Sequence, residues 1–175
     1  MPHDPVAAIR FETGRLLVGP WHDLAAELGI DLDRAVSGML TDATTRELPD
    51  DWSGDFSVER AHAWISERDR ESPTLLVVDQ SSQPLGLLIL FETSLDRATS
   101  DIRVGYLFAE SAWGRGLATE LIGGLIDCVR DKPAIRTLTA GVSRENHVSA
   151  RALTKNNFEL VSDSAANDLL YRLDV

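Results

Sequence analysis

The stretch from residue 101 to residue 143 constrains the fold more than any other part of the sequence. The segment DIRVGYLFA (101–109) predicts a strand, and the glycine-bearing ESAWGRG after it runs directly into LATELIGGLIDCVR (117–130). Apolar residues at helical spacing in this last segment predict an amphipathic helix, which Pro133 ends. IRTLTAGVS (135–143) then predicts another strand. A strand, a glycine loop, a helix and a strand therefore follow one another directly.

The remaining segments add strands and helices around this unit. PTLLVVD and LGLLILFE flank a short polar turn and predict a β-hairpin, and FELVSD and DLLYRLDV predict another. Ser57 and Asn146 are the predicted N-caps of two helices. The other expected elements are a strand at 15–21, two short helices within 22–41 that Gly29 and Gly38 delimit, a loop at 42–56, and helices at 57–71 and 147–157. This order predicts an α/β or α+β fold with a mixed sheet, and the length predicts one domain over residues 1–175.

Composition argues against several classes of function. Acidic residues exceed basic ones by 28 − 17 = 11, which argues against a broad basic surface for nucleic acid. The same charge favours solubility first and a cationic partner second. The four histidines are scattered and Cys128 is the one cysteine, so we expect neither a metal site nor a disulfide. We see no membrane span and no signal peptide, and we therefore expect a cytoplasmic protein.

The glycines at the start of helix 117–130 allow two interpretations. A helix N-terminus has unpaired N–H groups and partial positive charge, which suit a phosphate or pyrophosphate. Gly114 and Gly116 would let the backbone approach that group, while Arg115 adds charge and Thr119 a hydroxyl. The segment lacks the Gly-Lys-Ser/Thr of a P-loop and the third glycine of a Rossmann fingerprint. Taken alone, the pattern favours the simpler interpretation, a glycine-rich turn between a strand and a helix.

The surrounding order changes this balance. VGYLFAESAWGRGLATELI, an apolar strand and NHVSARALTKNNFEL together resemble the GNAT superfamily of acetyl-CoA-dependent N-acyltransferases. TGRLLVGPW and LPDDWSGDFSVERAHAWI resemble its branch of RimJ/RimL-type N-terminal acetyltransferases of ribosomal proteins. The resemblance covers nearly the whole chain. It implies a mixed, mostly antiparallel twisted sheet with helices on both faces, and acetyl-CoA as co-substrate without a metal.

The resemblance also assigns the residues that would bind coenzyme A. The phosphate loop of the superfamily falls on Trp113, Gly114, Arg115, Gly116, Leu117 and Ala118, next to Thr119. The backbone of Leu107 and Phe108 would pair with the pantetheine amides, Asn146 would hydrogen-bond pantetheine, and Ser149 would lie near the sulfur. Two positions depart from the family pattern: Trp113 replaces Gln or Arg, and Asn157 replaces a glycine before Phe158. Asparagine tolerates the left-handed conformation, so we expect the helix end to survive. The alternative for Asn146 and Ser149 is that they only cap a helix.

The implied reaction is direct attack of a neutral amine on the thioester. The backbone N–H of Phe108 is the candidate donor to the oxyanion, and Ser149 the candidate acid for the leaving thiolate, because the sequence places no tyrosine near its helix. Related sequences often carry a glutamate where this chain has Arg103, so Asp101 and Glu92 are the candidate bases. Arg103 would instead suit a carboxylate of the substrate.

Three hypotheses follow for the function. The first is an N-acetyltransferase acting on a primary amine, such as a protein N-terminus, a polyamine, an amino acid or an aminoglycoside. The second is a non-catalytic acyl-CoA-binding sensor or interaction module, which the missing glutamate at Arg103 favours. The third is generic nucleotide binding at the glycine loop. The sequence leaves open the acceptor, the length of the acyl group and the formation of a homodimer.

Overall fold

The computed structural model describes residues 6, 8–48, 50–94, 99–163 and 168–175. The strands are β1 (Phe11–Glu12), β2 (Leu16–Pro20), β3 (Thr74–Asp79), β4 (Pro84–Ser94), β5 (Ser100–Phe108), β6 (Ile135–Ser143), β7 (Glu159–Asp163) and β8 (Asp168–Asp174). The α-helices are α1 (Trp21–Leu28), α2 (Leu32–Met39), α3 (Asp42–Thr45), α4 (Val58–Glu71), α5 (Leu117–Arg130) and α6 (His147–Lys155). Single 3₁₀ turns lie at Asp50–Trp52 and Glu110–Ala112. Among the described residues, no helix is both long enough and apolar enough to cross a bilayer.

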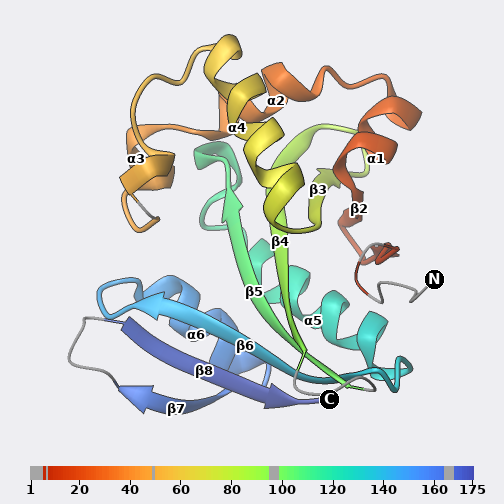
Figure 1. The fold of residues 1–175 in the computed structure, drawn as a ribbon, viewed down its shortest axis with the longest axis vertical. Coiled ribbons are helices and arrows are strands. Elements are labelled where there is room, and N and C mark those ends of the chain that lie inside the picture. Colours follow the sequence, from red (N-terminus) through yellow and green to blue (C-terminus); the bar gives the residue numbers. More distant parts are fainter. Residues whose placement is uncertain (1–5, 7, 49, 95–98, 164–167) are drawn as a thin grey trace.

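Within the described residues, the strands form one eight-stranded sheet in the order β1-β2-β3-β4-β5-β6-β8-β7 (Figure 1). Each pair of neighbours is antiparallel except β5 and β6, which run parallel. The parallel pair requires a crossover, and α5 supplies it on one face of the sheet. The sheet is therefore mixed and mostly antiparallel.

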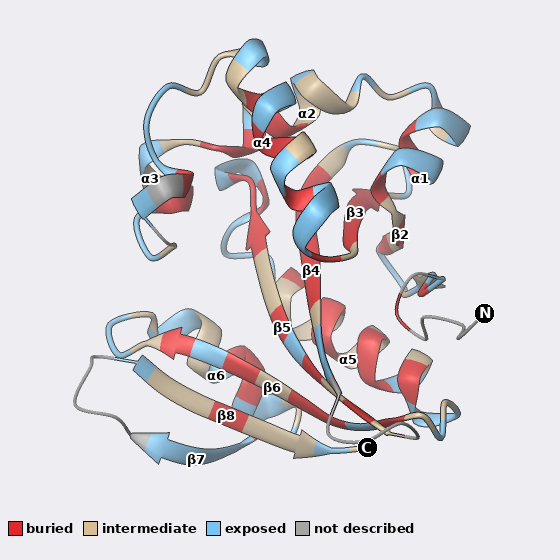
Figure 2. Cartoon of the chain, in the orientation of Figure 1, coloured by how far each residue is buried: buried red, intermediate tan, exposed pale blue. Residues whose placement is uncertain are grey.

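Helices cover both faces of the sheet. On one face, the apolar side chains of α5 and α6 pack against Leu75, Val77, Leu88 and Leu90. On the other face, α1, α2 and α4 pack against Leu76, Val78, Leu87 and Ile89. Because successive residues of β3 and β4 point to opposite faces, these central strands are buried on both sides (Figure 2). The predicted fold class, a mixed sheet flanked by helices on both faces, is confirmed.

Several local predictions are confirmed as well. Ser57 caps α4 by accepting a hydrogen bond from the Arg60 N–H, and Asn146 caps α6. Asn157 has φ 63°, so the expected left-handed residue follows α6.

Other parts of the fold differ from the sequence-based expectation. The segment expected to be a loop contains α3 and a 3₁₀ turn, and β1 was not predicted because it has two residues. Gly29 ends α1 in the left-handed conformation, whereas Gly38 lies inside α2.

The parallel strands β5 and β6 are paired over only part of their length. Their pairing runs from Ser100 opposite Ile135 to Arg103 opposite Thr139, and we call this the closed end. Beyond it, Val104–Phe108 stays paired with β4, and Ala140–Ser143 stays paired with β8. The two strands consequently diverge, as Figure 1 shows, and we call this the open end. At the open end the sheet is therefore split into two halves, in which β5 pairs with β4 and β6 pairs with β8.

Candidate functional site

The backbone of β5 presents polar groups to the open end. The Ala109 N–H donates to the Leu85 carbonyl at 2.8 Å, so Ala109 faces β4. In an antiparallel pair this orientation alternates, and the backbone groups of Phe108 and Tyr106 therefore face away from β4, toward the opening. Those of Leu107 face β4. Of the two residues predicted to pair with pantetheine, Phe108 is thus the one whose backbone groups face the opening.

Trp113 contacts this backbone in the structure. Its indole Nε1–H donates to the Phe108 carbonyl oxygen at 2.9 Å, while the residue as a whole is 51% exposed. The contact folds the beginning of the glycine loop back onto the end of β5. An incoming amide that donates to the Phe108 carbonyl must therefore replace the indole or share the oxygen with it.

The glycine loop leads into the N-terminus of α5. Gly114 and Gly116 have φ values of 71° and 72°, a conformation that glycine adopts without a steric penalty. Gly116 is the N-cap of α5, and no side chain accepts from the first N–H groups of the helix. Trp113–Gly116 are exposed, Leu117 is buried, and Ala118 and Thr119 are half-buried. The loop thus presents unpaired amides, as the phosphate-binding interpretation requires.

A second arginine reaches this helix terminus, and the sequence analysis did not identify it. Arg15, in the turn between β1 and β2, donates from Nη1 to the Arg115 carbonyl at 2.8 Å and from Nε to the Glu120 carboxylate at 2.6 Å. Its side chain remains 49% exposed. Arg15 therefore adds positive charge close to the glycine loop, across 100 residues of sequence.

Glu120 holds Arg15 in this place. Its carboxylate also accepts hydrogen bonds from the Thr13 hydroxyl at 2.6 Å and from the Arg15 N–H at 2.8 Å. Burial acts to raise the pKa of Glu120, but these hydrogen bonds and the Arg15 charge outweigh it and lower the pKa. The ionised carboxylate therefore ties the N-terminal segment to the first turn of α5.

The N-terminus of α6 lies at the end of β6, on the other side of the opening. The Asn146 Oδ1 accepts from the Ser149 N–H at 3.1 Å, so its side chain caps the helix. Its amide Nδ2 makes no hydrogen bond to another described residue. Capping and ligand binding are thus compatible, because they use different atoms of one side chain.

The two helices are joined near the glycine loop. The Asn156 Nδ2 donates to the Thr119 carbonyl at 3.0 Å, which brings the end of α6 to the first turn of α5. The start of α6, with Asn146 and Ser149, follows the open end of β6. The phosphate-loop candidates and the Asn146–Ser149 pair therefore border the same divergence of β5 and β6.

The two predicted bases lie elsewhere. Asp101 and Glu92 are at the closed end, where Glu92 is paired with Ile102 of β5. The Thr137 hydroxyl donates to Asp101, and the Ser100 hydroxyl donates to Glu92. Asp101 is five residues from Tyr106 along β5, about 16 Å in an extended strand. The structure therefore does not bring either carboxylate to Ser149, and strand periodicity alone did not show at which end the strands diverge.

Arg103 ends the paired segment of β5 and is exposed. Its guanidinium lies against β6 at Gly141, where a Cβ would meet Nη2 at 2.6 Å. The absence of a side chain at Gly141 thus makes room for Arg103 to cross from β5 to β6. No described carboxylate forms an ion pair with it, so its charge is available at the base of the opening.

Tyr106 is the residue at the opening that sequence reasoning missed. The expectation that no tyrosine lies near α6 is wrong, because the Tyr106 side chain of β5 lies next to Ser149. Burial raises the pKa of Tyr106, and the neighbouring Ser149 hydroxyl offsets part of the rise. The alternation of side chains along β5 could have predicted this position, because it places Tyr106 on the same face of the strand as Phe108.

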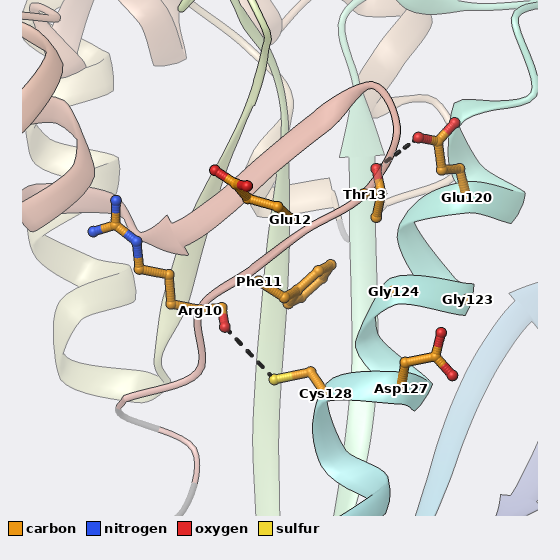
Figure 3. A pocket seen from close by; sticks show the side chains of 9 residues that line it. All are labelled: Arg10, Phe11, Glu12, Thr13, Glu120, Gly123, Gly124, Asp127 and Cys128. Atoms are coloured by element: carbon orange, nitrogen blue, oxygen red, sulfur yellow. Dashed lines mark hydrogen bonds between the residues drawn. The ribbon is translucent and has the colours of Figure 1, made fainter.

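A separate hollow of about 490 Å³ lies between β1 and α5 (Figure 3). Phe11 and Thr13 pack so closely on α5 that a Cβ at Gly124 would meet Thr13 Cγ2 at 2.6 Å. The Cys128 Sγ–H donates to the Arg10 carbonyl at 3.7 Å. The lining includes the carboxylates of Glu12, Glu120 and Asp127 with the single cation Arg10, so it would repel a pyrophosphate. The described residues also contain no group of His, Cys, Asp and Glu side chains that could hold a metal ion.

Comparisons with known proteins identify the family of the sequence and find the same fold in solved structures. Residues 15–159 match the family described as acetyltransferase (GNAT) domain. A Bacillus anthracis acetyltransferase of the GNAT family has the same fold, with a TM-score of 0.73 and 14% identity over 95% of this chain and 98% of that one. The microcin C7 self-immunity acetyltransferase MccE, solved with acetyl-CoA and AMP, has a TM-score of 0.69 and 13% identity over 93% and 94%. Mycobacterium smegmatis RimJ, solved with CoA-disulfide, has a TM-score of 0.65 and 20% identity over 95% and 85%.

No curated protein matches the sequence. At these identities the solved structures establish the fold alone, and the family match, which covers most of the sheet and the glycine loop, establishes the relationship. The chain belongs to the GNAT acetyltransferase family.

Proposed function

We propose that the protein is an acetyl-CoA-dependent N-acetyltransferase that transfers the acetyl group directly to a primary amine. The observation that carries this proposal is the divergence of β5 and β6 between the glycine loop and the Asn146–Ser149 pair. A closed sheet at this point would leave no backbone groups for pantetheine. The open end offers them next to a helix N-terminus with unpaired amides.

The residues present fit coenzyme A. The N–H groups at the start of α5, with Arg115 and Arg15 nearby, would hold the pyrophosphate in the manner of a helix-terminus anion site. The Phe108 backbone would pair with pantetheine as a strand edge pairs with an extended peptide, and the free Asn146 Nδ2 would add one donor. The chain supplies these cations locally, although its net charge is −11.

The transfer would need no covalent enzyme intermediate. The amine nitrogen forms a bond to the thioester carbon, and the Phe108 N–H is the proposed donor to the oxyanion. The C–S bond then breaks, sulfur keeps the electron pair next to Ser149, and the nitrogen releases its proton to water. Because Asp101 and Glu92 lie at the closed end, we propose that the amine arrives already neutral and that its own pKa sets the alkaline rise of the rate.

We further propose an acceptor with an anionic group near its amine. Arg103 stands at the base of the opening, where its charge has no described carboxylate partner. An amino acid or a protein N-terminus with an acidic residue beside it would suit this charge. We also propose that the chain is of the RimJ/RimL-type branch, forms one domain over residues 1–175 and acts in the cytoplasm.

Binding and turnover test the proposal separately. Acetyl-CoA should raise the melting temperature in proportion to the logarithm of its concentration, more strongly than ATP or NAD at equal concentration. Release of free thiol is then measured with a panel of amines, with and without a carboxylate. Arg103→Ala should weaken selectivity for the anionic acceptors by about fivefold, the size of an exposed ion pair.

The second candidate function is a sensor of acyl-CoA, favoured by Arg103 at the position where relatives often carry glutamate. Stabilisation by acetyl-CoA without thiol release from any amine would support this alternative. No stabilisation by any CoA species would contradict both functions.

A further inference from the structure

Tyr106 has a buried hydroxyl without a partner at the open end. Its Oη is shielded from solvent and forms no hydrogen bond within the described part of the chain. The ring contacts that of Phe108 edge to face, with centroids 6.3 Å apart. A buried hydroxyl without a hydrogen-bond partner costs folding free energy, so a functional role for it is a reasonable explanation.

The nearest candidate partner is the hydroxyl of Ser149. Ser149 lies close enough to lower the pKa of Tyr106, but the two oxygens do not meet the geometry of a formed hydrogen bond. The two hydroxyls are therefore adjacent but not joined by a hydrogen bond in this structure. Hydrogen bonds of active sites are often long without substrate and shorten when it binds.

We propose that Tyr106 is a positioning residue for Ser149, which donates its phenolic hydrogen to Ser149 Oγ and so directs the serine hydrogen toward the sulfur of coenzyme A. This inference rests on the proposed function. A free serine hydroxyl rotates, so its hydrogen can point in several directions. When the serine oxygen accepts a hydrogen bond, fewer directions remain for that hydrogen. The serine hydrogen would then be aimed where negative charge develops as the C–S bond breaks.

The hydrogen bond would act without a transfer of the phenolic proton. Burial raises the pKa of Tyr106, so the phenol stays protonated at neutral pH and remains a donor. A phenol of raised pKa is a poor acid toward a thiolate, but it keeps its hydrogen and can still donate a hydrogen bond. The thiolate leaves with its electron pair, stabilised by Ser149, and takes a proton from water after release.

The thiol pKa of bound CoA tests the inference without turnover. Cys128→Ala serves as the background, because it leaves bound CoA with the only thiol. Thiolate absorbance is followed against pH, with the protein alone subtracted. The bound thiol should have a pKa about one unit below that of free CoA, and Tyr106→Phe and Ser149→Ala should each remove most of this shift.

Kinetics provide the second readout. Tyr106→Phe should lower kcat about tenfold, the equivalent of one pKa unit, with the KM for acetyl-CoA unchanged. In the Ser149→Ala background, Tyr106→Phe should have no further effect, because both changes remove one coupled interaction. Tyr171→Phe is the matched control, since it removes the hydroxyl of the chain's other tyrosine, which is buried on β8.

The outcomes separate the inference from the proposed function. If CoA does not bind the parent protein, the proposed function fails. If CoA binds and Ser149→Ala removes the pKa shift while Tyr106→Phe preserves it, the positioning role is excluded and the acetyltransferase proposal stands. A tenfold loss of kcat that adds fully to that of Ser149→Ala also excludes the role, because the two hydroxyls then act independently.

Discussion

The two ends of the β5–β6 pair differ in how their polar groups are satisfied. At the closed end, Asp101 and Glu92 each accept a hydrogen bond from a neighbouring hydroxyl. At the open end, the Tyr106 hydroxyl and the first amides of α5 have no partner within the described residues. Asp101 and Tyr106 lie on the same strand, β5, and only the first of them has its polar group satisfied within the sheet. Satisfied polar groups are expected to affect stability, and unsatisfied ones to affect binding and rate.

The largest effect is expected from Gly116→Val. A β-branched residue at φ 72° is strained by about 1–2 kcal/mol, and its side chain would stand at the capping position of α5, where the phosphate is expected. Affinity for acetyl-CoA should fall at least about 100-fold, or about 2.8 kcal/mol. Isothermal titration calorimetry measures the affinity for acetyl-CoA.

Gly29→Val is the matched control for this change. Gly29 has φ 68° at the end of α1, and a Cβ there would meet nothing within 4 Å. Its strain is therefore similar, while acetyl-CoA affinity should be unchanged. Equal losses of affinity in both variants would show that the glycine loop is a turn and not a phosphate site.

A smaller effect is expected from Asn146→Asp, which separates the two roles of Asn146. An aspartate still accepts from the Ser149 N–H and suits the helix dipole, so α6 keeps its cap and its stability. The change removes the Nδ2 donor, and acetyl-CoA affinity should fall about tenfold. If both the acetyl-CoA affinity and the melting temperature are unchanged, Asn146 only caps the helix.

Substitutions at the closed end should change the stability of the protein and not the rate of acetyl transfer. Asp101→Asn and Glu92→Gln should each leave kcat/KM within about twofold and the alkaline rise of the rate in place. Each should cost about 1 kcal/mol or less of unfolding free energy, since an amide oxygen still accepts from Thr137 or Ser100. A flattened alkaline limb in either variant would restore that carboxylate as the base.

The same contrast explains what the sequence could predict. Local signals identified the strand, glycine loop and helix from residue 101 to residue 130, and the left-handed conformation of Asn157. Residues that act across the sheet were missed, because their role depends on pairing that periodicity does not encode. Arg15 meets α5 across 105 residues, and the position of Asp101 depends on where β5 leaves β6. The single-domain organisation stays a prediction.

The smallest effect concerns Glu120, which joins the N-terminal segment to the glycine loop. Its pKa is lowered in the folded protein from the ordinary 4.5, because hydrogen bonds from Thr13 and Arg15 outweigh the opposing effect of burial. A lowered folded pKa means that the stabilisation is fully present above pH 4.5 and is lost as the pH falls through the folded value. Between pH 7 and pH 3 the melting temperature of Glu120→Gln should therefore decline less than that of the parent protein. The difference should be equivalent to about 0.5 kcal/mol, since Arg15 is half-exposed and solvent screens the pair. Parallel decline of both curves would mean that the ion pair adds no stability, and that Arg15 is held at the helix terminus by its bond to the Arg115 carbonyl alone.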